Sequence, residues 1–382
     1  MDYWILNSTI AFLLCITFAG FLIPQILLIS FRRNLFDEPD ERKIHHGTVP
    51  RLGGIAFTPV ICFSISLLLG MSILFGDARL LGLMTYNSRS LAFGFCALFI
   101  LYLVGMADDL IGIRYRAKFV VQIICSLLVI AGGLWVQNLY GLFGIHEIPD
   151  WVGIPLTILI MVYVINSINL IDGIDGLASG LSAAAFITYG VMFHLIGRHA
   201  YAMLSFACLG VLVPFFYFNV FGDPSRRQKI FMGDTGSLTI GLLLAFLGLE
   251  LMLVSPDRCP VFGTNPLILA LSPLIVPCFD VTRVFIHRVR SHGNPFLPDK
   301  THIHHKLLAL GLPQRIAMVT IVAVALLFNC VNILLSRYID ITLLLLLDII
   351  VWTFANIILS NQIKKHNAKN NNCLLYTSDA AD

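Results

Sequence analysis

Two asparagines and two aspartates stand at regular three-residue intervals in NSINLIDGIDGLASG, the segment that begins at residue 166. They are Asn166, Asn169, Asp172 and Asp175, and strongly apolar stretches lie on both sides of them. Neighbouring residues supply no Lys or Arg, and an unpaired carboxylate in or beside an apolar layer is costly. Carboxylate and amide oxygens suit a hard cation such as Mg²⁺, which also takes water and substrate phosphate as ligands. The segment therefore predicts a metal site.

A structural explanation covers only part of this segment. Asp175 has the position of an N-cap for the helix that follows, but a cap leaves the other three groups unexplained. Asn166 and Asn169 are one helical turn apart and share a face. Gly173 and Gly176 let the chain turn and let its backbone approach a ligand closely. The spacing thus favours a ligand site over a capped helix end.

Two further acidic motifs are candidates for the same chemistry. Asp108 and Asp109 are adjacent at the end of an apolar run, and adjacent carboxylates repel each other unless a cation or a shared proton intervenes. Asp234 lies between Gly233 and Thr235 in KIFMGDTGSLTIG, just before another apolar run. The structural alternatives are a solvated helix end for the pair and an N-cap for Asp234.

A histidine cluster, His302, His304 and His305, crowds one loop in PDKTHIHHKLLALG. The pattern HxHH has no i,i+4 pair and no Cys, which argues against zinc. Histidine can also donate a hydrogen bond to phosphate or act as an acid. Contact with a phosphate or nucleotide is therefore favoured over a metal, and a solvated loop is the structural alternative.

The composition is that of a polytopic α-helical membrane protein. Of the 382 residues 58% are hydrophobic and 12% are charged, and the mean hydropathy is +0.85, whereas an ordinary soluble domain is about a quarter charged. Many unpaired apolar runs can cross a bilayer only as helices. The net charge of +3 is too small to indicate nucleic acid. Eleven spans are predicted, near residues 8–30, 53–75, 90–107, 118–138, 153–171, 177–196, 200–221, 232–254, 266–286, 315–336 and 340–360.

The distribution of positive charge predicts the orientation. Most of the 25 Lys and Arg residues fall in the odd-numbered loops and the C-terminal tail, and cytoplasmic loops carry the excess of these residues. The N-terminus is therefore expected outside and the C-terminus in the cytoplasm. Residues 1–363 are predicted to form a single transmembrane domain and 364–382 a cytoplasmic tail, whose last ten residues, CLLYTSDAAD, read as non-native. All four polar clusters then lie on the cytoplasmic side, the arrangement of an interfacial active site that uses Mg²⁺ for phosphate chemistry.

An ion-coupled transporter is the competing class, because carriers also contain intramembrane acids and helices broken by glycine. Carriers place such groups near the bilayer midplane, however, whereas these motifs stand at the ends of spans on one face. No internal repeat is visible in the sequence. An enzyme is therefore the preferred interpretation.

Five motifs in series give the chain a recognisable family likeness. They are KIHHGTVPRLGG, GMADDLIG, NSINLIDGIDGLASG, KIFMGDTGSLTIG and PDKTHIHHKLLALG. The chain resembles the polyprenyl-phosphate N-acetylhexosamine-1-phosphate transferases (glycosyltransferase family 4), membrane enzymes that begin bacterial cell-envelope glycans. PDKTHIHH and eleven spans resemble the branch that transfers N-acetylglucosamine 1-phosphate. The alternative branch, phospho-MurNAc-pentapeptide transferase, typically has three consecutive histidines and ten spans, and here Ile303 interrupts the run.

The resemblance implies a UDP-N-acetylhexosamine donor, with N-acetylglucosamine preferred, an undecaprenyl phosphate acceptor and UMP as product. It also implies Mg²⁺ dependence, with Mn²⁺ as an alternative ion, and an active site on the cytoplasmic face of the bacterial inner membrane. Which glycan follows and whether the chain forms an oligomer are left open. Within this reaction we assign the metal to Asp234, Asn169 and Asp172. Asp108 is the candidate base or orienter of the lipid phosphate, and Asp109 supports it.

The remaining assignments concern substrate contacts. Asn166 and Asp175 are placed near the substrate, Asp175 at the nucleotide, and the histidine cluster on the donor phosphates. The family's first motif often carries a third acid or a Lys shortly after the Asp pair. Here the nearest charges are Arg114, Arg116 and Lys118, and Lys118 is assigned a phosphate-side role.

Overall fold

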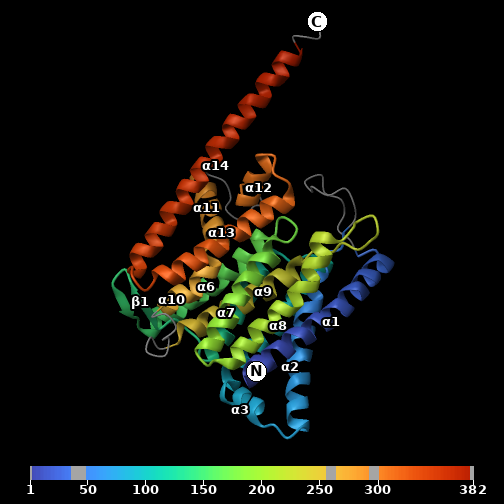
Figure 1. Cartoon of the computed structure of the whole chain (residues 1–382), viewed down its shortest axis with the longest axis vertical. Coiled ribbons are helices and arrows are strands. Elements are labelled where there is room, and N and C mark those ends of the chain that lie inside the picture. The colour runs from blue at the N-terminus through green and yellow to red at the C-terminus, as the bar shows by residue number, and fades with distance from the viewer. Residues whose placement is uncertain (1, 36–48, 255–263, 292–300, 379–382) are drawn as a thin grey trace.

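The fold is a bundle of helices (Figure 1). The computed structural model of the chain describes residues 2–35, 49–254, 264–291 and 301–378. The first half of the motif KIHHGTVPRLGG and the start of PDKTHIHHKLLALG therefore lie outside the described residues. The helices are α1 (Tyr3–Arg33), α2 (Phe57–Leu74), α3 (Arg79–Tyr86), α4 (Ser88–Ile111), α5 (Tyr115–Ala131), α6 (Asp150–Ile171), α7 (Leu177–Leu195), α8 (His199–Phe216), α9 (Gly233–Met252), α10 (Pro266–Leu271), α11 (Ile275–Arg290), α12 (Ile303–Ala309), α13 (Gln314–Leu335) and α14 (Ile341–Ser378).

The described residues contain ten helices long and apolar enough to cross a membrane. This confirms a polytopic α-helical membrane architecture. The eleventh predicted span, 118–138, corresponds to α5, which has 17 residues and lies at the short end of the range that spans a bilayer. The antiparallel hairpin of β1 (Asn138–Leu142) and β2 (Ile145–Glu147) that follows α5 was not predicted, and neither were the short helices α3 and α12. Helix α12 contains His304 and His305, which the sequence analysis placed in a loop.

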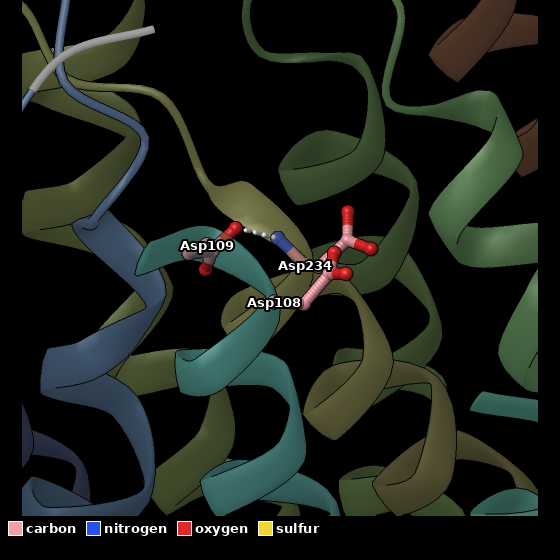
Figure 2. A group of neighbouring side chains, drawn as sticks. All are labelled: Asp108, Asp109 and Asp234. Carbon is pink, nitrogen blue, oxygen red and sulfur yellow. Dashed lines mark hydrogen bonds between the residues drawn. The ribbon is translucent and has the colours of Figure 1, made fainter. Parts of the chain in front are cut away.

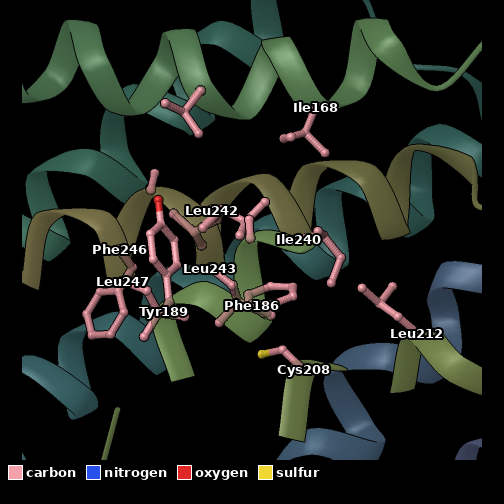
Figure 3. Close-up of a cluster of buried hydrophobic side chains, with 14 of the residues drawn as sticks. Ile168, Phe186, Tyr189, Cys208, Leu212, Ile240, Leu242, Leu243, Phe246 and Leu247 are labelled. Atoms are coloured by element: carbon pink, nitrogen blue, oxygen red, sulfur yellow. The ribbon is translucent and has the colours of Figure 1, made fainter. Parts of the chain in front are cut away.

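Helix α9 is the central element of the bundle. Every residue from Thr235 to Met252 is buried, and α4, α6, α7, α8 and α10 contact this helix. Figure 3 shows part of the surrounding apolar core, in which Leu243 and Phe246 of α9 lie near Phe186 and Tyr189 of α7. Helix α9 is therefore fixed on all sides, and so is the position of its first turn.

The loop that precedes α2 docks directly on the start of α9. The backbone N–H groups of Gly53 and Gly54 donate to the carbonyls of Phe231 and Met232, at 3.0 and 2.9 Å. A methyl group on Gly54 would lie 2.1 Å from the backbone nitrogen of Gly236. The glycine pair thus permits backbone contact between two loops that are far apart in sequence.

We expect Gly54→Ala to destabilise the protein, because the added methyl group forces two backbones apart. Overpacking of this kind costs about 1–3 kcal/mol. Thermal unfolding in detergent measures the loss. Gly70→Ala in α2 is the control, since a methyl group there meets no atom within 4 Å. Equal unfolding midpoints for the two variants would contradict the expectation.

The motif-bearing ends of the helices gather at one end of the bundle. The last turn of α4, the start of α5, the last turn of α6 and the start of α9 meet there through side-chain contacts. Figure 1 shows α12 at this end, with α3 at the opposite end. The predicted gathering of the polar clusters on one face is therefore observed in the fold.

Candidate active site

Three carboxylates form the centre of the site (Figure 2). Asp108 and Asp109 end α4, and Asp234 lies in the first turn of α9. One oxygen from each carboxylate lies within 4.8 Å of one from each of the others. Two motifs separated by more than a hundred residues thus build one acidic cluster.

Asp109 holds the start of α9 in place. Its carboxylate accepts hydrogen bonds from the backbone N–H groups of Asp234 and Thr235, at 2.7 and 2.9 Å, and from the Thr235 hydroxyl at 2.5 Å. These N–H groups have no partner within their own helix, so Asp109 acts as an N-cap supplied by another helix. Both of its oxygens are engaged. Asp109 thus positions Asp234, and its predicted support of Asp108 stays a prediction.

Lys118 lies between the other two acids. Its ammonium donates to Asp108 Oδ2 at 2.6 Å and to Asp234 Oδ2. Asp108 Oδ1 accepts from the backbone N–H of Ile113 at 2.6 Å. A single cation thus bridges two carboxylates that would otherwise repel each other.

Asn169 presents an amide oxygen beside these acids. Its Nδ2 donates to Asp234 Oδ1 at 3.2 Å and to Ser237 Oγ at 2.8 Å. Both bonds use the NH₂ group, so the amide oxygen remains available as a ligand. The predicted association of Asn169 with Asp234 is therefore present in the structure.

Asp172 is the free carboxylate of the segment. It makes no hydrogen bond or ion pair with any residue that the structure describes, and its side chain is open to solvent on one side. The protein around the rest of the group, together with the charges of Asp234 and Asp175, raises the pKa of Asp172 to about 7, against the opposing charge of Arg51. An acid in such surroundings gains most from a bound cation.

Asp175 and Asn166 both form bonds with other side chains of the protein. Asp175 pairs with the buried ammonium of Lys229 at 2.5 Å, so the sequence interpretation that the segment lacks a cationic partner is wrong for this acid. Asn166 exchanges hydrogen bonds with Gln122 of α5, and the shorter of the two, from Nδ2 of Asn166, is 2.6 Å. These contacts tie loops and helices together, and direct substrate contact by either residue stays a prediction.

The histidine cluster contacts the loop that carries Asp172. The His304 ring lies against Gly173, where a methyl group would come within 2.2 Å of Nε2. Only 1% of His304 is exposed, and neither ring nitrogen has a hydrogen-bond partner among the described residues. Burial and the neighbouring His305 and His302 lower the pKa of His304 to about 3, so the ring is neutral at pH 7. The His304 and His305 ring centroids are 4.2 Å apart.

Comparison with known proteins shows which family the chain belongs to. Residues 91–252 match the profile of glycosyl transferase family 4. An undecaprenyl-phosphate alpha-N-acetylglucosaminyl 1-phosphate transferase of Salmonella typhi is 30% identical over 299 residues, covering 78% of this chain and 75% of the relative. The chain belongs to glycosyl transferase family 4.

Two further relatives in this family carry similar names. The enzyme of the same name from Escherichia coli K12 is 29% identical over 82% of this chain and 81% of its own length. A "probable undecaprenyl-phosphate N-acetylglucosaminyl 1-phosphate transferase" of Bacillus subtilis is 29% identical over 86% of this chain and 85% of its own length. The profile match contains the acids and Lys118, while the histidine cluster lies beyond it.

The sequence analysis did not identify Gln122 and Asp280, which contact residues of the candidate site. Asp280 Oδ2 lies 2.8 Å from Nδ1 of His302. A charged residue within an apolar span is a signal that could have singled out Asp280, because such residues are costly unless they have a partner. Gln122 carried no comparable signal.

The residues present fit a hard divalent cation. Asp108, Asp109 and Asp234 bring carboxylate oxygens within 4.8 Å of one another, and Asn169 offers an amide oxygen beside Asp234. Asp172 lies outside this group, and its place among the ligands stays a prediction. No cysteine or histidine belongs to the acidic group found in the described residues. This donor set suits Mg²⁺ or Mn²⁺ and does not suit zinc.

We expect Gly173→Ala to lower activity strongly, because the methyl group displaces the His304 ring or the Asp172 loop. Transferase activity and unfolding temperature, measured together, separate an effect on the site from general destabilisation. Gly82→Ala in α3 is the control, since no atom lies within 4 Å of its added methyl group. A Gly173→Ala variant as active as Gly82→Ala would show that this contact is unimportant.

Proposed function

We propose that the chain transfers N-acetylglucosamine 1-phosphate from UDP-N-acetylglucosamine to undecaprenyl phosphate and releases UMP. The observation that carries the proposal is Lys118, whose ammonium bridges Asp108 and Asp234 beside Asn169 at the ends of membrane helices. A lipid phosphate and a soluble nucleotide sugar can meet at such a place. The names of the relatives support the donor and the acceptor.

The reaction exchanges one phosphoanhydride for another. An oxygen of the lipid phosphate forms a bond to the β-phosphorus of the donor, and the bond from that phosphorus to the bridging oxygen breaks, so that UMP leaves with the electron pair. Two polyanions must approach each other, so charge neutralisation is the main catalytic task. Lys118 is placed to meet one of these phosphates, and Asp108 orients the attacking group. A phosphate monoester has a second pKa near 6, so Asp108 need not be a strong base.

The metal is assigned to Asp234, Asn169 and Asp172, with Asp108 as the neighbouring carboxylate. When bound, Mg²⁺ would supply charge neutralisation on the pyrophosphate and on the leaving UMP. Asp109 contributes by holding the first turn of α9, which carries Asp234. The histidine cluster is assigned to the donor phosphates, with His305 as its partly exposed ring and the buried rings of His302 and His304 behind it.

We expect removal of divalent cations to abolish transfer. Dialysis against EDTA followed by re-addition of Mg²⁺ or Mn²⁺ should restore UMP release, because oxygen donors accept either ion. Ca²⁺, which prefers more ligands at longer distances, is the comparison ion. Full activity in EDTA would contradict a metal-dependent reaction.

In the membrane topology that we propose, the chain crosses the bilayer eleven times and the site lies on the cytoplasmic face of the bacterial inner membrane. Lys118 lies in the first turn of α5, at the site, and α6 starts from the far end of the bundle and returns to Asn169 in its last turn. This course of the chain supports an eleventh crossing in α5. Figure 1 places the N-terminus and the C-terminal end of α14 at opposite ends, as an odd number of crossings requires. Protease accessibility of N- and C-terminal epitope tags in inside-out vesicles tests this orientation.

The decisive experiment is UMP release by purified protein in detergent with undecaprenyl phosphate, Mg²⁺ and a panel of UDP-sugars. Release from UDP-N-acetylglucosamine that needs both lipid and metal is the expected result. Release only from UDP-MurNAc-pentapeptide would move the chain to the other branch. No release from any donor by folded protein would overturn the proposal and favour a transporter.

A further inference from the structure

Asp280 and Arg283 are charged residues of α11 inside the apolar candidate span Pro266–Arg290, and the reaction described above assigns neither of them a role. The Asp280 side chain is 0% exposed and that of Arg283 is 19% exposed. Charges in such a place are costly unless they are paired and hydrogen-bonded. Their contacts therefore indicate what the pair does.

The contacts of Asp280 converge on the start of α12. Its Oδ2 lies 2.8 Å from His302 Nδ1. Its Oδ1 accepts from the backbone N–H of Ile303 at 3.1 Å and from Arg283 Nη2 at 2.8 Å. Arg283 Nη2 also donates to the carbonyl of Thr301 at 2.5 Å. The pair thus fixes both the backbone around His302 and its ring.

A carboxylate at Nδ1 determines which nitrogen of a neutral histidine carries the proton. Because Asp280 can only accept when it is ionised, Nδ1 of His302 is the donor and Nε2 is left as an acceptor. The His302 ring is nearly parallel to that of His304, at 9° with centroids 5.7 Å apart. His304 in turn lies against Gly173, next to Asp172. The arrangement set at Asp280 therefore extends to the acidic loop.

We propose that Asp280 is a positioning residue for the donor side of the site and acts through His302. It holds the ring in one tautomer and one orientation, with Arg283 completing the charge balance. The inference rests on the proposed function, in which the histidine cluster contacts the donor phosphates. A role limited to fold stability is the alternative, and it predicts different results below.

The kinetic test compares D280A, H302A and the double variant. D280A is expected to raise KM for UDP-N-acetylglucosamine on the order of tenfold, as for loss of a hydrogen bond to a charged group, with a smaller change in kcat. In the H302A background the same change should have almost no further effect, because Asp280 acts through that ring. Additive effects of the two substitutions would overturn the proposal.

Asp348→Asn is the matched control. Asp348 is also a buried carboxylate within an apolar helix, and it accepts from Asn332 Nδ2 at 2.8 Å. It lies in α14, whose side-chain bonds to α12 come from Asn356 and Ser360. D348N should therefore share any loss of stability but keep wild-type KM. If D280A and D348N had the same KM and kcat, the role of Asp280 would be structural only.

A spectroscopic measurement tests the positioning without substrate. In protein with ¹⁵N-labelled histidine, the His302 resonances, assigned by comparison with H302A, should show a protonated Nδ1. In D280N the side-chain NH₂ can donate a hydrogen bond to Nδ1 of His302. The neutral ring then carries its proton on Nε2, and the ¹⁵N chemical shifts of both ring nitrogens change. D280N also serves if D280A fails to fold. Unchanged His302 resonances in D280N would contradict the inference, whereas a wild-type protein inactive on every UDP-sugar would contradict only the proposed function.

Discussion

Asp234→Asn is expected to eliminate transfer while leaving the protein folded. The substitution keeps the shape of the side chain and the backbone N–H bonds to Asp109. It removes the charge that balances Lys118 and the carboxylate assigned to the metal. Loss of a preorganised charge in such a site lowers the rate on the order of 10²–10³-fold or more. Mg²⁺ binding by calorimetry should weaken in parallel with UMP release.

Asp223→Asn is the control for this variant. Asp223 lies in the same loop region before α9, is half-exposed and bonds locally to Ser225. It should retain full activity and Mg²⁺ affinity. An Asp234→Asn protein with wild-type turnover would remove Asp234 from the metal site. Loss of both activity and folded protein would point to a structural role for the charge.

The architecture was largely predictable because long apolar runs have few alternatives in a bilayer. The run of residues 118–138 was assigned to a single span, whereas the structure ends the helix at Ala131 and continues into a hairpin. Gly132 and Gly133 end the helix, and Gly133 has φ +99°. Apolar composition does not reveal such an ending, because the hairpin residues that follow are also partly apolar.

The sequence indicated which acidic residues belong to the candidate site, but it did not indicate which residues pair with them. The acids stood out because unpaired charge is costly in an apolar chain. Their partners did not, because Lys229 meets Asp175 and Lys118 meets Asp234 only after helices far apart in sequence have packed together. The docking of Gly54 on Gly236 was hidden for the same reason. Local sequence indicates which groups need partners, and tertiary packing determines which partners they receive.

These pairings divide the acids into two groups with different tasks. Asp109, Asp175 and Asp280 have oxygens engaged by the protein itself, at an N-cap, a buried lysine and a histidine respectively. Asp172 has no such partner in the described part of the chain, and Asp108 and Asp234 share the single ammonium group of Lys118. The first group positions the loops. The second group is the one that can exchange its partner for a metal or a phosphate.

Lys118→Gln tests that exchange, and its expected result differs from that of Asp234→Asn. The ammonium bridges two carboxylates, so removing it deprives the lipid or donor phosphate of its cation. Turnover should fall on the order of 10²-fold or more. The two freed carboxylates attract a divalent cation more strongly than before, because the positive charge that competed with it is gone. Mg²⁺ affinity should therefore be retained or increased.

Lys365→Gln in the exposed part of α14 is the matched control and should change neither property. Turnover and Mg²⁺ calorimetry on the same preparations separate the outcomes. Loss of turnover with loss of Mg²⁺ binding would mean that Lys118 maintains the geometry of the acids. Loss of turnover with retained binding would mean that metal and lysine neutralise different phosphates. Because Asp108 and Asp234 stand on separate helices and Asp109 holds α9 independently of Lys118, the acids should keep their places and the second result is expected.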